Sequence, residues 1–138
     1  MIKKERLEQL MTDSIGTEHY YKRPPFEGLV NTDGVINIQY EADMFWFVDM
    51  VGGYIPDVIK EYKKAQDGFF LVNLHVNKDH TAKFWICREV YEEGKYKYPD
   101  VVAQDIPYID LPDCDLQFFL ELLQESPIKF CLLCPSEH

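Results

Sequence analysis

The sequence predicts an α+β fold, with a small antiparallel sheet of about four strands, a central hairpin and helices packed on one face. Two observations predict this fold. Residues 69–90 contain two apolar segments of alternating pattern around the turn Lys78-Asp79, as in a β-hairpin. Residues 2–11 and 44–51 space their apolar side chains as amphipathic helices do. The length of 138 residues fits one domain, residues 1–138.

The N-terminal residues are expected to form a helix followed by an irregular segment. The helix covers residues 2–11, ends near Asp13, and places on one face the apolar side chains of Ile2, Leu7, Leu10 and Met11. Residues 14–25 are expected to lack regular structure, because Gly16 and Pro24-Pro25 interrupt helices and strands.

Three short helices are expected next. Either residue of Thr32-Asp33 can cap a helix over residues 35–41, because its side-chain oxygen accepts from free backbone N–H groups. A second helix covers about residues 44–51, and Gly52-Gly53 ends it. The third, residues 56–64, begins with a proline, whose missing N–H is harmless in a first turn.

The alternating pattern divides the central hairpin, strands 69–77 and 81–90, into two faces. One face is continuously apolar and comprises Phe70, Val72, Leu74, Val76, Phe84 and Ile86. The other face is mixed and comprises Leu71, Asn73, His75, Lys83, Trp85 and Cys87. The mixed face is either a binding patch anchored by Trp85 and His75, or a surface that a helix or the C-terminal tail covers.

The C-terminal third is expected to contribute two strands and a helix. Residues 92–99 predict a polar loop. Residues 101–109 predict a strand that is either at a sheet edge or bulged, because Pro107 lacks a backbone donor. Residues 112 to about 122 predict a helix with two acids in its first turn, where the helix dipole favours anions. Residues 128–133 predict the last strand.

An excess of acidic residues is the clearest functional signal. Asp and Glu number 24 against 14 Lys and Arg, for a net charge of -10. Residues 24–59 hold six acids and no base, and residues 98–138 hold eight acids and one base, Lys129. This charge disfavours direct binding to nucleic acid or membranes and favours basic partners.

The residues with chemical potential do not form a recognisable catalytic or metal site. The pair Cys131-x2-Cys134 has the spacing of half a zinc site, but residues three apart on a strand point to opposite faces. The hairpin register places Cys87 opposite Leu71 and away from His75, which argues against a cysteine nucleophile. We therefore expect no cofactor, no metal and no enzymatic activity, and we expect the four cysteines to pack as reduced thiols.

No stretch of the sequence predicts a membrane span or a signal peptide. The longest strongly apolar run, residues 44–48, is far short of about 20 residues. The charged N-terminus is not followed by an apolar segment, so a cytoplasmic location is expected.

Four short segments together resemble a family of small, uncharacterised bacterial domains, often carried by phages and mobile elements. The segments are Gly16-Thr17-Glu18-His19-Tyr20-Tyr21, Thr32-Asp33-Gly34-Val35, Phe45-Trp46-Phe47-Val48-Asp49 and Leu132-Leu133-Cys134-Pro135-Ser136-Glu137. The resemblance covers most of the chain and implies no activity, so it assigns no catalytic residue. It implies a mobile-element protein that acts inside a bacterial cell.

These observations lead to the hypothesis of a non-enzymatic, acidic binding protein. Its expected role is to inhibit a host nucleic-acid-handling defence system, as an anti-CRISPR or other anti-defence factor, by occupying or docking beside the basic surface of a nuclease or RNA-guided effector. The expected partner contacts are Asp33, Glu41, Asp43, Asp49, Asp57, Asp105, Asp110, Asp113, Asp115, Trp85 and His75. The alternatives are a housekeeping domain whose acidity serves solubility, and a small enzyme that uses carboxylates or cysteines.

Overall fold

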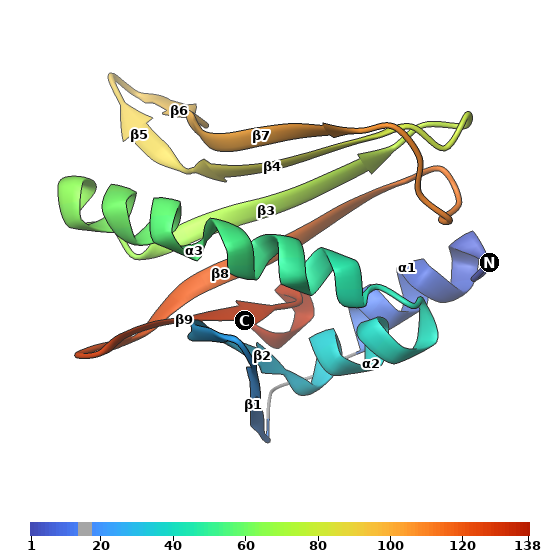
Figure 1. Cartoon of the computed structure of the whole chain (residues 1–138). Coiled ribbons are helices and arrows are strands. Elements are labelled where there is room, and N and C mark those ends of the chain that lie inside the picture. The colour runs from blue at the N-terminus through green and yellow to red at the C-terminus, as the bar shows by residue number, and fades with distance from the viewer. Residues whose placement is uncertain (14–17) are drawn as a thin grey trace.

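A large mixed β-sheet organises the chain in the computed structural model, which describes residues 1–13 and 18–138. Seven strands follow the order β1-β2-β9-β8-β3-β4-β7. They are β1 (Tyr20–Arg23), β2 (Phe26–Thr32), β3 (Phe69–Val76), β4 (Ala82–Arg88), β7 (Asp100–Ile106), β8 (Cys114–Glu125) and β9 (Ile128–Leu133). The helices α1 (Lys4–Asp13), α2 (Asp33–Glu41) and α3 (Phe45–Ala65) lie on one face of this sheet and leave the other open (Figure 1).

The α+β class is confirmed, whereas the prediction of a small antiparallel sheet of about four strands is wrong. The sheet has seven strands, and its β2–β9 pair is parallel, so it is mixed. A separate two-stranded sheet, β5 (Val90–Glu92) and β6 (Lys95–Lys97), replaces the expected polar loop over residues 92–99. This hairpin turns at Glu93-Gly94, both with positive φ, and it projects beyond the end of β4 and β7 (Figure 1).

Strand β8 accounts for most of the error, because a helix was expected over residues 112–122. Its buried side chains alternate with exposed or half-buried ones, a period of two that indicates a strand: Cys114, Leu116, Phe118 and Leu120 face the core. Both of its edges are paired, with β3 on one side and β9 on the other. The acids at the start of this segment are typical of a helix N-terminus. Pairing along both edges nevertheless satisfies the backbone hydrogen bonds of the segment as a strand, so tertiary context overrides its local helix signal.

The segment before α2 also forms strands where irregular structure was expected. Strands β1 and β2 pair in an antiparallel hairpin that turns at Pro24-Pro25. The expectation for residues 14–17 lies outside the described residues. Strand β2 provides the neighbour that β9 requires, with Val30 opposite Cys131.

Helix α3 is a single helix of 21 residues, so the predicted interruption at Gly52-Gly53 is wrong. Relative to alanine, two glycines and one internal proline cost about 5 kcal/mol in a helix. Five apolar side chains of α3 are buried, Phe47, Val48, Val51, Ile55 and Val58, and each contributes roughly 1.5–3 kcal/mol. Burial on the sheet therefore outweighs the unfavourable helix propensity.

The central hairpin is confirmed, with β3 and β4 antiparallel and Cys87 opposite Leu71. Its predicted apolar face lies against the helices and is fully buried. The edge position of β7 is also confirmed, and Pro107 follows directly after its last residue. Within the described ranges, no helix combines the length and apolarity that crossing a bilayer requires.

Candidate functional site

Five of the nine acids that we expected to contact a partner bind groups of the chain itself. Asp33 accepts hydrogen bonds from the backbone N–H groups of Glu18 and His19. The other four each face a basic side chain, in the pairs Glu41–Arg6, Asp49–Arg23, Asp113–Lys4 and Asp115–His75. In the part of the chain that the structure describes, the exposed Asp43, Asp57, Asp105 and Asp110 form no ion pair.

Acids from both acid-rich sequence windows meet at one hollow of about 570 Å³. It lies between the N-terminal end of α1, the α2–α3 junction and the loop after β7, which gather at one end of the sheet (Figure 1). We call it the acidic hollow; it is lined by Met1, Ile2, Glu41, Ala42, Asp43, Trp46, Ile106, Tyr108, Ile109 and Asp110. The fold therefore places Asp43 and Asp110, which are far apart in sequence, at the same hollow.

The charge of the acidic hollow comes mainly from Asp43 and Asp110. Glu41 accepts from the Arg6 guanidinium at 2.6 and 2.8 Å, and this hydrogen bonding lowers the pKa of its carboxyl. Asp43 and Asp110 are exposed and have no such partner among the described residues. Tyr108, whose side chain is 64% exposed, and the half-buried Trp46 add aromatic surface beside these two carboxylates.

The open face of the sheet carries the predicted residues His75 and Trp85. His75 Nδ1 lies 2.5 Å from Asp115 Oδ1, and Nε2 lies 3.0 Å from Asn77 Oδ1. The hydrogen bond to Asp115 raises the pKa of His75. Both ring nitrogens therefore face an oxygen of a neighbouring side chain, and the protonated ring can donate to both of them.

Trp85 borders a second hollow, of about 420 Å³, on the same open face. We call it the aromatic hollow; it is lined by Phe69, Leu71, Asn73, Trp85, Cys87, Glu89, Tyr98, Gln117 and Phe119. Gln117 Nε2 donates to Asn73 Oδ1 at 3.0 Å, and Asn73 is only 7% exposed. Among the described residues, the three helices lie on the other face of the sheet, whereas the ring of the C-terminal His138 lies 5.2 Å from Phe119 and 6.1 Å from Phe69 at the edge of this hollow.

The four cysteines are buried and unreactive in this arrangement. Burial raises the pKa of Cys114 to about 11 and that of Cys131 to about 12. Cys131 packs with Val30 and Leu133 on the open face, whereas Cys134 belongs to the main core. The described residues contain no group of three or more His, Cys, Asp or Glu side chains that could hold a metal ion.

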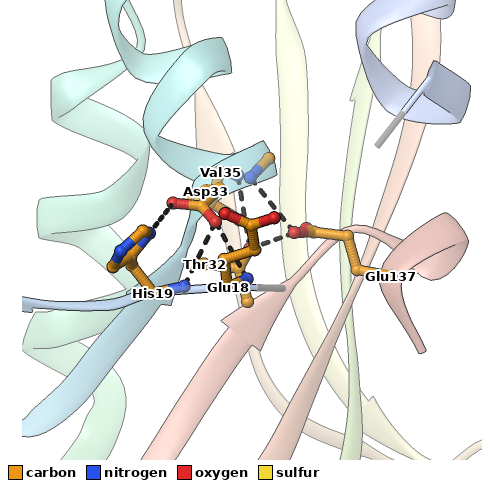
Figure 2. A network of polar contacts seen from close by, with 7 residues as sticks. Glu18, His19, Thr32, Asp33, Val35 and Glu137 are labelled. Atoms are coloured by element: carbon orange, nitrogen blue, oxygen red, sulfur yellow. Dashed lines mark hydrogen bonds and ion pairs between the residues drawn. The ribbon is translucent and has the colours of Figure 1, made fainter. Parts of the chain in front are cut away.

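A buried carboxylate joins the C-terminus to the start of α2 (Figure 2). Glu137, which is 8% exposed, accepts from Thr32 Oγ1 at 2.6 Å, Gly34 N at 3.1 Å and Cys134 N at 3.0 Å. Thr32 also accepts from Val35 N, which confirms it as the cap of α2. This network holds two of the segments quoted in the sequence resemblance together, and its role is structural.

Four residues of the two hollows were not expected from the sequence: Glu89, Tyr98, Tyr108 and Gln117. No local pattern marks these residues, because each becomes part of a hollow only through strand pairing or loop placement. Asp57 and Asp105, by contrast, were expected as contacts but line neither of the two hollows.

Comparison with known proteins identifies a family of unknown function. Residues 5–138 match the family described as "Family of unknown function (DUF6876)". No curated protein and no solved structure matches the chain.

Proposed function

This chain belongs to the DUF6876 family of unknown function, and we propose that it is a non-enzymatic binding protein that engages a basic partner through its acidic surface. The net charge of -10 favours such a partner at long range. At short range, the acidic hollow offers carboxylates beside aromatic surface, which is the combination that attracts lysine and arginine side chains.

One observation carries the proposal: Asp43 and Asp110, from the two acid-rich windows, line the same hollow and form no ion pair with a described residue. An acid that already faces an arginine, as Glu41 does, contributes little field to a partner. Two uncompensated carboxylates at one site instead produce a local negative potential, which speeds association and makes it sensitive to salt.

In its specific form, the proposal assigns this partner to a host defence system that handles nucleic acid. The chain would act in the cytoplasm of a bacterial host, as an inhibitor encoded by a phage or mobile element. It would occupy or dock beside the basic surface of a nuclease or RNA-guided effector, in place of the phosphate backbone. The support for this form is the acidity together with the resemblance described above.

The test is a tagged capture from a bacterial lysate, with stepwise salt elution and identification of the captured protein by mass spectrometry. The double variant Asp43→Asn/Asp110→Asn removes the two charges of the acidic hollow at nearly constant side-chain size. The matched control is Glu27→Gln/Glu93→Gln, which removes the same net charge at exposed positions outside the hollow.

We expect the wild type and the control to retain one basic protein to similar salt concentrations, and the hollow variant to release it at lower salt. Identification of a nuclease or RNA-guided effector would support the specific form. Equal elution of the hollow variant and the control would show that net charge alone matters, which contradicts a site at the acidic hollow. Capture that is insensitive to salt would contradict electrostatic engagement altogether.

A further inference from the structure

The aromatic hollow on the open sheet face has the composition of a site for an organic cation. Four aromatic rings line it, those of Phe69, Trp85, Tyr98 and Phe119, together with a single carboxylate, Glu89. Aromatic faces attract cations through their negative quadrupole, and the attraction increases as the cation is desolvated. We propose that this hollow receives an arginine side chain of the basic partner, an inference that rests on the proposed function.

The three central strands build the floor and walls of this hollow. Strands β3, β4 and β8 contribute alternate residues to the open face, so Leu71 and Cys87 form a buried apolar floor. Tyr98 comes from the chain that leaves the β5–β6 hairpin, and its side chain is 54% exposed. The exposed hairpin therefore supplies one wall, which explains why sequence analysis did not connect Tyr98 with Trp85.

One ring of the hollow already attracts a cation from the chain itself. Lys83 Nζ lies 5.2 Å from the centre of the Trp85 ring, although Lys83 does not line the hollow. At the other end, the His138 ring lies 5.2 Å from Phe119 and 6.1 Å from Phe69. Of the four rings, Tyr98 is the most exposed, whereas Phe69, Trp85 and Phe119 are half-buried.

The polar groups of the hollow favour a guanidinium over other cations. Gln117 uses its Nε2 group to bind Asn73 Oδ1, which leaves the Gln117 carboxamide oxygen as an acceptor. The Glu89 carboxylate forms no ion pair with any described residue. A guanidinium is planar and stacks on indole and phenol rings while it donates in its own plane to such acceptors. A quaternary ammonium has no N–H group to donate, and a lysine ammonium is more strongly hydrated.

The volume agrees with a single side chain rather than a large ligand. About 420 Å³ lies near the lower end of the range of roughly 300–1,000 Å³ for pockets that hold small molecules. The overall negative charge disfavours a phosphorylated ligand at the same place. The hollow is thus suited to an arginine that projects from the partner's surface.

The test follows the two tryptophan indole N–H resonances by NMR, because Trp46 lines the acidic hollow and Trp85 lines the aromatic one. Trp85→Phe assigns the resonances. The probe is the capped peptide acetyl-Gly-Arg-Gly-amide, compared with the same peptide carrying lysine or the neutral isostere citrulline. We expect the arginine peptide to shift the Trp85 resonance saturably and more tightly than the lysine peptide, and the citrulline peptide to leave it unchanged.

Two carboxamide variants locate the contact within the hollow. Glu89→Gln should weaken binding of the arginine peptide about fivefold, the effect of losing a partly exposed ion pair. Glu93→Gln removes the same charge in the turn of the β5–β6 hairpin, outside the hollow, and should change binding less than about twofold. A shift of Trp46 alone, citrulline binding equal to arginine, or equal effects of the two variants would overturn the proposal.

The peptide titration tests the aromatic hollow and the lysate capture tests the proposed function, so a negative result in one does not imply a negative result in the other. If the peptide shifts Trp85 but no partner is captured in a salt-dependent manner, the hollow binds arginine and the proposed function is wrong. If a partner is captured through the acidic hollow while Trp85 does not respond to the arginine peptide, the proposed function holds and the assignment of the aromatic hollow is wrong.

Discussion

Substitution by alanine should change the stability of the protein in opposite directions at Gly52 and Gly53, two adjacent glycines in the middle of α3. A Cβ atom at Gly53 would meet nothing within 4 Å, so Gly53→Ala should raise the free energy of unfolding by about 0.5–1 kcal/mol, the usual helix gain. A Cβ atom at Gly52 would lie 2.4 Å from Phe26 Cγ. Normal carbon contacts are about 3.5–4 Å, so the Phe26 ring would have to move by about 1 Å.

The expected result of Gly52→Ala is a lower stability. Overpacking of this kind costs about 1–3 kcal/mol against a helix gain of about 0.5–1 kcal/mol, so the midpoints leave a net loss of about 1 kcal/mol and the upper limit is about 2.5 kcal/mol. Urea denaturation of both variants, with unchanged m-values, measures the difference. A double-mutant cycle with Phe26→Leu should remove most of the penalty, because the shorter side chain leaves room for the new methyl group. A Gly52→Ala protein as stable as Gly53→Ala would refute the close approach of α3 to Phe26.

Three further predictions concern buried or paired polar groups. Glu137→Gln should lower the free energy of unfolding by about 2 kcal/mol, because one acceptor oxygen becomes an NH₂ group that faces donors; urea denaturation equal to wild type would contradict this. Asp115→Asn should lower the pKa of His75 in an NMR titration. The pKa of His75 is raised in the folded protein. The stability that the His75–Asp115 pair contributes is therefore present below the unfolded pKa of about 6.5 and is lost as the pH rises through the folded pKa. A His75 pKa that Asp115→Asn leaves unchanged would contradict this ion pair. Asn31→Leu should raise the free energy of unfolding by about 1 kcal/mol, because the fully buried Asn31 carboxamide has no hydrogen-bond partner among the described residues; a loss of stability would show that the amide is satisfied in solution.

The elements predicted correctly are those whose own residues carry the determining pattern. In the hairpin β3–β4, alternation over both strands defines the face and the register without help from distant segments. The cap of α2 by Thr32 is equally local, since donor and acceptor are three residues apart. The edge position of β7 was one of the two alternatives that Pro107 indicated, because its missing N–H is a property of the residue itself, although the strand ends at Ile106 and not at Ile109 as predicted.

The errors occur where a distant partner decides the conformation. Strand β8 carries leucines and acids that resemble a helix, but pairing with β3 and β9 satisfies its backbone on both edges. Gly52-Gly53 was interpreted as a break, whereas contact with Phe26 and burial of the apolar face keep α3 continuous. In both cases the energy of packing exceeds the local propensity.

For the candidate sites too, some properties follow from the sequence and others only from the folded chain. Composition alone determined the sign of the net charge, and the basic partner that we propose from it rests on long-range attraction, which depends on the number of charges more than on their positions. Only the tertiary structure decided which acids are available to a partner. Four of the predicted contacts form ion pairs within the chain, namely Glu41–Arg6, Asp49–Arg23, Asp113–Lys4 and Asp115–His75. The tertiary structure also brought Asp43 beside Asp110, and Tyr98 into the hollow that Trp85 lines. A binding site needs groups within a few ångströms of one another, and for residues this far apart in sequence only the folded chain sets that distance.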